Sequence, residues 1–380
     1  MMQNLQLSLA VNSPTYEINI CCGLLFDHKA LLHTLKPLAH RFALITHPTI
    51  ASLYGNELTK LLNAQGMDTV QLTFPSGEEN KNRETKEKIE NQLFEQGFGA
   101  DSCIIALGGG VVTDLSGFIA ATYCRGIPHV LIPTSLLAMV DASIGGKTGV
   151  NVPYGKNMLG CIYQPRKILI DPTVLSSLPQ SEVRNGVAEM IKHALIADKG
   201  YFDFLKQNPR QLLTIDFNAT QTAIYGSCKI KKEIVEKDPH SKGIRNLLNL
   251  GHTVGHAIES VTHYSIPHGE AVAIGIMTEC YLAHLMGILS MDTVEKIHQI
   301  FLDYALPFKL PSHISFDALF KAMTLDKKAI KNTPRFALIE EIGKPYSSQG
   351  DFCITVDLLH INKALHWMIH DLCSHQRAHV

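Results

Sequence analysis

The chain has 380 residues, and at about 150 residues per domain this length favours two domains over a single small module. Apolar residue types make up 46% of the chain and charged types only 18%, which excludes disorder caused by weak hydrophobicity. The formal net charge of -1 provides no global field for gathering nucleic acid or an anionic membrane, so any anion site must be local.

The first half of the chain alternates short β-branched apolar runs with a segment of helical periodicity. Strands are predicted at residues 42–46, 69–73, 103–107 and 129–133. Residues 82–98, in which charges flank Ile89 and Leu93, predict an exposed amphipathic helix. This alternation of strands with a helix predicts a parallel sheet, and therefore an α/β domain.

After a last strand-like run at 168–172, the spacing of apolar residues becomes helical. Helices are predicted at residues 181–198, 219–237, 251–261, 269–289 and 294–304, before a strand-like run at 335–339. Proline restricts the residue before it and commonly precedes a new element, so we place the domain boundary at Leu178–Pro179. The pattern predicts an α/β domain over 1–178 and an α-helical domain over 179–380.

A glycine-rich turn follows one predicted strand and opens a helix. It contains Gly108, Gly109 and Gly110 in succession. Consecutive glycines let a backbone turn tightly and approach a pyrophosphate, whose charge is met by N–H groups at the helix N-terminus. The spacing is not GxGxxG, because Thr113 stands three positions after Gly110, so a plain tight turn is the alternative to a dinucleotide site.

A second glycine-rich loop covers residues 141–149 and leads to a Gly-Lys-Asn sequence. Lys147 and Lys156 each stand beside glycine, where a compact cation can reach a phosphate. Either lysine alone is better interpreted as a solvated turn residue. Their clustering with Asp141 and Asn157 favours a polar site.

Glu189 lies among apolar residues on the predicted helix 181–198, with Lys192 and His193 on the same face. A carboxylate in such surroundings needs a cation or a metal if it is buried. The alternative is an exposed stripe of these three residues. We expect His193 to pack in the core rather than to bind a metal.

The 19 histidines are a high usage, and three of them suggest a metal site. His252 and His256 are one helical turn apart and can converge on a metal or divide the roles of ligand and proton carrier. His268 begins a helix rich in small residues. One Glu and two His with open coordination positions form the ligand set of a catalytic zinc site, which we favour over satisfied core histidines.

The nine cysteines include no CxxC pair, and several lie in apolar runs, so we expect reduced thiols. The N-terminal residues do not resemble a signal peptide, and no apolar run is long enough to span a bilayer. We therefore expect a cytoplasmic protein with neither a membrane nor a nucleic acid as partner.

These motifs resemble, in the same order, those of the 3-dehydroquinate synthase family. The resemblance rests on residues 108–114, 122–125, 133–149, 155–157, 186–192, 248–256 and 268–270, within a match from 75 to 328. It implies a Rossmann-like NAD-binding domain, an all-α metal-binding domain, a homodimer, and NAD⁺ and zinc or cobalt as cofactors. The implied reaction converts the sugar phosphate 3-deoxy-D-arabino-heptulosonate 7-phosphate to 3-dehydroquinate and phosphate, in the shikimate pathway of chorismate and aromatic amino acid biosynthesis. It proceeds by transient oxidation, phosphate elimination, re-reduction and intramolecular aldol closure.

The resemblance also implies roles for individual residues. The metal ligands would be Glu189, His252 and His268. Catalytic roles would fall to His256, Lys147, Lys192, Arg245 and Asn157. The substrate would contact Asp141, Lys231, Asn249, either Lys327 or Lys328, and Arg125 of the neighbouring subunit. The NAD site would be lined by Glu78, Lys81, Gly108, Gly109, Gly110, Asp114, Thr134, Ser135, Lys156 and Ser177.

Three positions depart from the family pattern. Ser241 stands where a glutamate is often credited with proton transfer, a role that His240 or a water could take. His47 stands where an aspartate would meet the adenosine ribose, and Thr113 replaces a glycine of the pyrophosphate loop.

Other functions compete with this one: a metal-dependent polyol or alcohol dehydrogenase, another sugar-phosphate cyclase, and a catalytically silent NAD-binding paralogue. The cations Lys147, Lys192, Lys231 and Arg245 favour a phosphorylated acid over a polyol. Arg245 with Asn249 suits a carboxylate-bearing substrate and so argues against another cyclase. Ser241 motivates the silent paralogue, and the intact set of candidate ligands argues against it.

Overall fold

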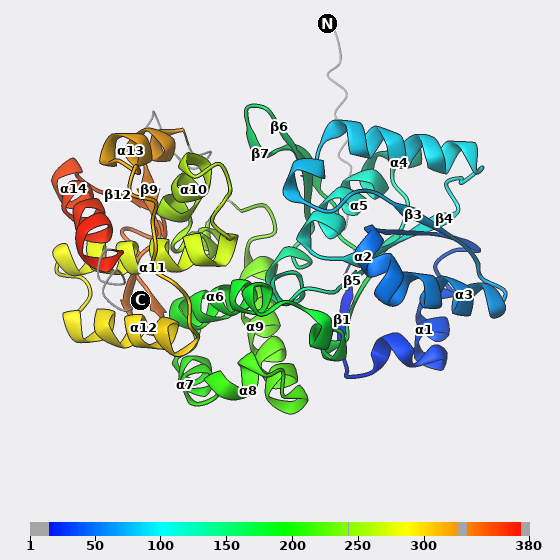
Figure 1. Ribbon diagram of the computed structural model, residues 1–380, viewed down its shortest axis with the longest axis horizontal. Helices are drawn as coiled ribbons and strands as arrows, with labels where there is room; N and C mark the ends of the chain where they lie inside the picture. Colours follow the sequence, from blue (N-terminus) through cyan, green and yellow to red (C-terminus); the bar gives the residue numbers. More distant parts are fainter. Residues whose placement is uncertain (1–14, 242, 326–332, 374–380) are drawn as a thin grey trace, which may run out of the picture.

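The molecule has two lobes that lie side by side along its longest axis (Figure 1). The computed structural model describes residues 15–241, 243–325 and 333–373. The N-terminal half forms an α/β lobe, and the C-terminal half forms a helical lobe.

A six-stranded sheet with the order β1-β8-β5-β4-β2-β3 forms the centre of the N-terminal lobe. Every strand pair in it is parallel. Its strands are β1 (Glu17–Ile20), β2 (Arg41–Thr46), β3 (Asp68–Thr73), β4 (Ser102–Gly108), β5 (His129–Pro133) and β8 (Lys167–Ile170). The helices of this lobe are α1 (His28–Leu35), α2 (Pro48–Ile50), α3 (Asn56–Ala64), α4 (Arg83–Glu95) and α5 (Gly110–Thr122).

Helices cover both faces of the sheet, with α4 and α5 on one side and α1 and α3 on the other (Figure 1). Every residue of β4 and β5 is buried, and this explains why the residues after Ser102 and His129, which begin these strands, are apolar in succession rather than in alternation. The predicted strands β2, β3, β4, β5 and β8 and the predicted helix α4 are confirmed, with ends that differ by a few residues. The edge strand β1 was not predicted, because it is short and only partly buried.

The strand order reverses between β2 and β4. From β2 the chain continues to β3 at one edge, and it then returns to β4 on the other side of β2 before adding β5 and β8. The segments that follow β2 and β4 therefore diverge. In open parallel sheets, ligands bind at such a switch point, outside the carboxyl ends of the strands.

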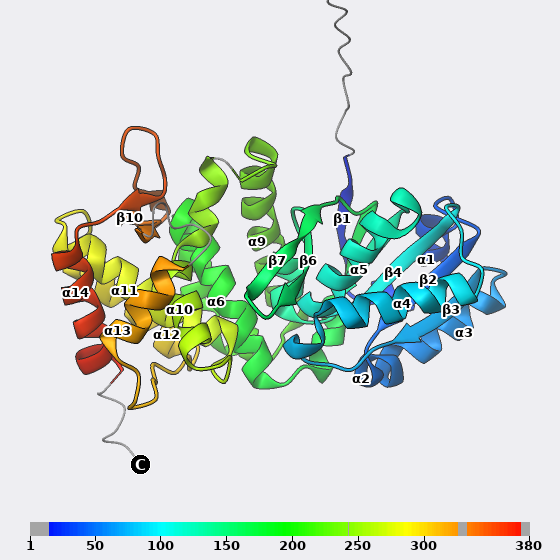
Figure 2. The ribbon, with the colours of Figure 1, turned by 90° about the horizontal axis from the view of Figure 1, so that it is seen from above.

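The segment predicted as a loop at 141–149 continues into a β-hairpin, which corrects the sequence-based expectation. Strands β6 (Lys147–Val152) and β7 (Gly155–Ile162) pair antiparallel, with Gly149 opposite Gly160. A Cβ on Gly160 would collide with the backbone carbonyl of Thr148, so the glycines here allow two strands to approach closely. The hairpin lies on the side of the N-terminal lobe that faces the helical lobe (Figures 1 and 2).

The C-terminal lobe is mainly helical. Its helices are α6 (Gln180–Ala197), α7 (Lys199–Gln207), α8 (Pro209–Leu213), α9 (Phe217–Lys237), α10 (His252–Val261), α11 (His268–Leu285), α12 (Met291–Asp303), α13 (Phe316–Thr324) and α14 (Leu358–Trp367). The predicted helices α6, α9, α10, α11 and α12 are confirmed. The strand-like run 335–339 is divided between β9 (Arg335–Phe336), which pairs with β12 (Ile354–Thr355), and β10 (Ile339–Glu341), which pairs with β11 (Lys344–Pro345).

Helices α10 and α11 pack unusually closely because small residues face each other. A Cβ on Gly255 would lie 3.2 Å from the carbonyl oxygen of Ala271, and a Cβ on Gly275 would collide with the carbonyl of Gly251. The many small residues of α11 thus have a packing role. The close approach also brings together His252 and His268, which begin the two helices.

None of the helices in the described ranges is both long and apolar enough to cross a membrane. All nine cysteines lie within those ranges, and no disulfide joins them. The thiols of Cys103, Cys228 and Cys280 are buried, and burial raises the pKa of the Cys103 thiol to about 12. These cysteines therefore behave as core residues, as their apolar surroundings predicted.

Candidate active site

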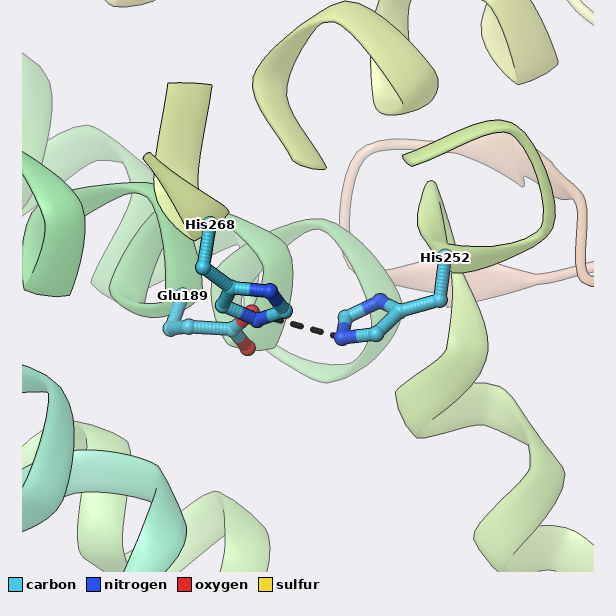
Figure 3. A group of neighbouring side chains, drawn as sticks. All are labelled: Glu189, His252 and His268. Atoms are coloured by element: carbon cyan, nitrogen blue, oxygen red, sulfur yellow. Dashed lines mark ion pairs between the residues drawn. The ribbon is translucent and has the colours of Figure 1, made fainter. Parts of the chain in front are cut away.

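The side chains of Glu189, His252 and His268 point toward one another from α6 and from the first turns of α10 and α11 (Figure 3). Glu189 Oε1 lies 3.5 Å from His252 Nε2 and 3.3 Å from His268 Nε2. One ligand atom from each residue lies within 4.8 Å of the others. One carboxylate and two imidazoles make a donor set suited to a divalent metal with open coordination positions.

Glu189 is completely buried, as are Lys192 and His193, so the alternative of an exposed stripe on α6 is excluded. Burial raises the pKa of Glu189, but the charge of Lys192, with which it forms an ion pair, outweighs this effect and holds the pKa below its usual range. Glu189 is therefore an ionised carboxylate in the interior, the form that a metal ligand requires.

In both His252 and His268, Nε2 faces Glu189 and Nδ1 faces a different polar partner. His252 Nδ1 lies 3.1 Å from the carbonyl oxygen of Leu250, and His268 Nδ1 lies 3.4 Å from Glu259 Oε2. Burial, together with Lys192, keeps the pKa of His252 well below its ordinary value, so this imidazole is neutral. Burial opposes a charge on His268, yet Glu259 and Glu189 raise its pKa to about 10, so a metal would displace a proton there.

His256 lies beside the triad rather than within it. Its ring centroid is 5.2 Å from that of His252 and 6.4 Å from that of His268. This position suits a group that moves a proton next to the metal site.

A second polar cluster centres on Asp141, in the short helical turn Ala138–Ala142 that follows β5. Lys231 Nζ donates to Asp141 Oδ1 at 2.7 Å, and Lys192 Nζ lies 3.8 Å from the same oxygen. Burial raises the pKa of Asp141, but Lys231 and Lys192 hold it well below its usual range. Asp141, Glu189 and His193 are also close enough to hold a metal, but the two ammonium groups already occupy that space.

His193 is part of this second cluster. Its Nδ1 lies 2.6 Å from Ser227 Oγ and its Nε2 lies 3.5 Å from Asp141 Oδ1. The ring is completely buried, and burial lowers the pKa of His193. We expected a packing role for His193, and the structure adds polar partners at both ring nitrogens.

Arg245 reaches the same region from the turn Ile244–Asn249. It is buried, and its guanidinium donates to the carbonyl oxygens of Gly145 at 3.0 Å and Pro239 at 2.9 Å. A Cβ at residue 145 would collide with the guanidinium, which accounts for the glycine. Asn249 ends the same turn, half-buried, and Lys147 begins β6.

Nine of the ten residues expected to line the nucleotide site gather at one edge of the sheet, and the tenth, Lys156, lies on the hairpin strand β7 and contacts Glu259 of α10. Glu78 and Lys81 follow β3, Gly108, Gly109, Gly110 and Asp114 end β4 and begin α5, Thr134 and Ser135 follow β5, and Ser177 follows β8. His47 follows β2. Since all these strands are parallel, the residues share the carboxyl edge, where the strand order reverses.

The glycine turn is packed tightly against the segment after β5. A Cβ on Gly109 would lie 3.3 Å from Ser135 Oγ, and a Cβ on Gly110 would lie 3.2 Å from Ala142 Cβ. The side chain of Thr113 is buried, and its hydroxyl donates to the carbonyl oxygen of Gly110 at 3.0 Å. The Thr113 hydroxyl is therefore bonded within the first turn of α5.

Lys81 connects the nucleotide edge with the hairpin. Its Nζ lies 2.5 Å from Asp114 Oδ2 and 2.6 Å from Asn157 Oδ1. Asn151 of β6 donates to Glu78 Oε1 at 2.7 Å. The structure thus brings together residues expected at the cofactor and residues expected at the substrate.

Some expected residues are not brought into these clusters. Arg125 is exposed, and among the described residues it makes no hydrogen bond or ion pair with the other candidates. Ser241 Oγ is buried and has no hydrogen-bond partner in the described part of the chain. Lys327 and Lys328 lie outside the described residues.

Two polar residues at the site were not predicted from the sequence. Ser227 lies one helical turn before Lys231 on α9, and it contacts His193. Glu259 follows His256 by three positions and His252 by seven, so it shares their helix face. That spacing was the available signal for Glu259.

Comparison with solved structures defines the class of fold. The chain superposes on 2-epi-5-epi-valiolone synthase from Streptomyces hygroscopicus, solved with NAD⁺ and Zn²⁺ bound, with a TM-score of 0.86 and 28% identity, covering 96% of this chain and 99% of that one. A 2-deoxy-scyllo-inosose synthase complexed with carbaglucose-6-phosphate, NAD⁺ and Co²⁺ has a TM-score of 0.85 at 23% identity, covering 92% of this chain and 95% of that one. The fold is that of the sugar-phosphate cyclases.

Sequence comparison gives the family. Residues 71–185 match the family model described as 3-dehydroquinate synthase N-terminal, and residues 186–329 match the model of its C-terminal part. A 3-dehydroquinate synthase from Nitrosomonas europaea is 44% identical over 346 residues, covering 91% of this chain and 92% of the relative. One from Vibrio atlanticus is 42% identical over 343 residues, covering 90% and 94%. The chain belongs to the 3-dehydroquinate synthase family.

Proposed function

We propose that this chain is an enzyme that converts 3-deoxy-D-arabino-heptulosonate 7-phosphate to 3-dehydroquinate and phosphate, a step of the shikimate pathway. The observation that carries the proposal is the position of a carboxylate–imidazole donor set beside the buried cations Lys192, Lys231 and Arg245. Such a site suits a substrate that offers both hydroxyl ligands for a metal and anionic groups for cations.

The triad fits a divalent metal, zinc or cobalt. Glu189 is buried and ionised, and its Oε1 faces two imidazole nitrogens at 3.3 and 3.5 Å. When bound by Glu189, His252 and His268, the metal would supply Lewis acidity and a template for substrate hydroxyls. His256 lies beside this triad and would hold or move a proton at the substrate.

The carboxyl edge of the sheet fits NAD⁺. The closely packed glycine turn leaves the N–H groups at the start of α5 for a pyrophosphate, and Thr134, Ser135 and Lys81 lie on the neighbouring segments. When bound there, NAD⁺ would accept and return a hydride. The charge of Lys81 is already oriented by Asp114 and Asn157.

The cations of the second cluster would bind the anionic groups of the substrate. Lys192 and Lys231 are held by Asp141, and Arg245 is held by two backbone carbonyls. Because the protein fixes these charges before the substrate arrives, they stabilise negative charge on the leaving phosphate without further rearrangement. Arg245 and Asn249 would contact the carboxylate, and Lys147 and Asn157 would act from the hairpin.

We also propose a homodimer in the cytoplasm. Arg125 is exposed and has a left-handed backbone, with φ 66°, next to Cys124 with φ 48°. A strained, exposed arginine away from the clusters of its own chain suits the contribution to a neighbouring active site that the family resemblance implies. The absence of disulfides among the described cysteines agrees with a reducing compartment.

A polyol dehydrogenase is the second candidate function. The chain shares its fold with glycerol dehydrogenase from Schizosaccharomyces pombe, with a TM-score of 0.66 at 14% identity, covering 94% of this chain and 91% of that one. This likeness extends to the fold alone, and the buried Lys192, Lys231 and Arg245 favour an acidic, phosphorylated substrate.

The test is incubation of the purified chain with the heptulosonate phosphate and zinc. NAD⁺ is added at a concentration far below that of the substrate. We expect stoichiometric phosphate and dehydroquinate with no accumulation of NADH, and we expect a chelator to stop the reaction. A dehydrogenase would instead accumulate NADH without releasing phosphate. Dimers that bind metal and NAD⁺ but release no phosphate would identify a silent paralogue and contradict the proposal.

A further inference from the structure

Glu259 is a buried carboxylate that the proposed chemistry does not use. It lies in α10 with its side chain only 4% exposed. Its two oxygens have different partners: Oε2 lies 3.4 Å from His268 Nδ1, and Oε1 lies 3.1 Å from Lys156 Nζ. A buried carboxylate needs such partners. Here one partner, His268, is a candidate metal ligand of the helical lobe, and the other, Lys156, belongs to the hairpin of the N-terminal lobe.

The imidazole of His268 therefore lies between two carboxylates. Glu189 faces its Nε2 at 3.3 Å, and Glu259 faces its Nδ1. An imidazole can bind a metal through one nitrogen only when the proton is on the other. A carboxylate beside Nδ1 favours a proton on that nitrogen.

Lys156 holds Glu259 in this orientation. Its ammonium lies 4.1 Å from the centre of the Tyr264 ring, so it has a second favourable contact at the same place. Lysine only donates hydrogen bonds, and it can accept none. The group that occupies the Glu259 Oε1 position must therefore be an acceptor.

We propose that Glu259 is a positioning residue for the metal ligand His268: its Oε2 accepts the Nδ1 proton and leaves the Nε2 lone pair for the metal, while Lys156 fixes Oε1. The inference rests on the proposed metal site. Carboxylate partners of metal-binding histidines typically contribute about 10–100-fold to metal affinity.

The test measures the affinity of the purified full chain for Zn²⁺ and Co²⁺, without substrate or NAD⁺, by competition with a chelator of known affinity. In Glu259→Gln, the amide oxygen must face Lys156, so the NH₂ group faces His268 Nδ1. This arrangement favours the tautomer that carries its proton on Nε2, which cannot bind the metal. We expect about 10–100-fold weaker metal binding.

Two further variants separate positioning from simple loss of charge. Lys156→Met leaves the carboxylate of Glu259 in place, so we expect metal affinity within a few-fold of wild type. In the double variant Lys156→Met/Glu259→Gln, the amide is free to turn its oxygen to His268 Nδ1. We expect the double variant to bind metal more tightly than Glu259→Gln alone, a rescue that a purely structural role would not produce.

Glu270→Gln is the matched control, because Glu270 lies in the first turn of α11 with His268, whose ion pairs in the described part of the chain are with Glu189 and Glu259 instead. We expect its metal affinity to match wild type. If Glu259→Gln does not fold, Glu259→Asp replaces it, with an expected loss of a few-fold because the shorter carboxylate recedes from Nδ1.

The outcomes separate this inference from the proposed function. Wild-type protein that binds no metal would overturn the metal site, and the inference with it. Wild-type protein that binds metal, with equal affinity in Glu259→Gln or in the folded Glu259→Asp, would overturn the inference alone. Equal losses in the Glu259 and Glu270 variants, or a double variant no better than Glu259→Gln, would also overturn it.

Discussion

Lys231 donates hydrogen bonds to both the carboxylate and the backbone carbonyl of Asp141. Asp141 follows β5 of the N-terminal lobe, and Lys231 lies on α9 of the helical lobe. The pair therefore joins the two lobes within the second polar cluster. Because the same oxygen of Asp141 also faces Lys192 and His193, a change in this pair disturbs the whole cluster.

Replacing Lys231 by Met should destabilise the fold and not only reduce activity. It leaves Asp141 with a weaker partner in Lys192, at 3.8 Å. We expect the free energy of unfolding to fall by about 2 kcal/mol, less than for a fully buried pair because the Asp141 side chain is 24% exposed. Urea unfolding measures this value. In the double variant with Asp141→Asn the loss should be smaller than the sum of the single losses, and strict additivity would contradict the coupling.

The variants His252→Ala and His256→Ala should differ in their metal content. We expect His252→Ala to lose bound metal and activity, because it removes a nitrogen that faces Glu189 at 3.5 Å. His256→Ala should keep its metal and lose activity, because its ring lies beside the triad. Metal analysis after gel filtration checks both variants. Full activity and full metal content in His252→Ala would contradict the assignment of His252 as a metal ligand.

Gly275→Ala should separate α10 from α11. The added Cβ would collide with the carbonyl of Gly251 and lie 2.9 Å from the backbone nitrogen of Gly255. Such overpacking costs about 1–3 kcal/mol or more, and here it also moves His252 away from His268. We expect lower thermal stability and weaker metal binding. The matched control is Gly200→Ala, an exposed helical position where the Cβ would meet only Asp198 Oδ1, at 3.3 Å.

His129 should make the stability of the fold fall at low pH. This histidine is buried in β5 against the Tyr163 ring, and burial lowers its pKa to about 3, below the value of about 6.5 in an unfolded chain. The unfolded state therefore takes up a proton first, so the contribution to stability is present above about pH 6.5 and is lost as the pH falls toward 3.

The variant His129→Phe isolates this effect. Between pH 7 and pH 5, wild type should lose about 2 kcal/mol more of its free energy of unfolding than the variant does. Urea unfolding at the two pH values measures the difference, and parallel pH profiles would contradict the assignment.

The strands, and Glu189, His252 and His268 as separate candidates, could be predicted because each has a signal in its own stretch of sequence. After their first residues, Ser102 and His129, the buried strands β4 and β5 are apolar runs, and the glycine turn at Gly108 directly follows one of them. Glu189 was conspicuous because a charge stands among apolar residues on α6. Its burial then required a cation or metal partner, and the structure supplies both Lys192 and the two imidazoles.

The remaining features depend on contacts between distant segments. The hairpin was not predicted because glycines such as Gly149 and Gly160 are typical of loops. Only the pairing of the two strands shows that these glycines allow the close approach of their backbones. Glu259 is unremarkable along the chain, and only the close packing of α10 and α11 places it beside His268. The polar partners of His193 come likewise from α9 and from the turn after β5.

The hairpin divides two neighbouring residues between the two lobes: Lys156 contacts Glu259 of the helical lobe, whereas Asn157 contacts Lys81 at the nucleotide edge. Asn157 has a left-handed backbone, with φ 54°, and the register of the hairpin shifts between Val150 and Val152, so this irregularity turns the two neighbouring side chains to different partners. Changes in related chains that remove the irregularity should therefore cost the hairpin its contact with one of the two lobes.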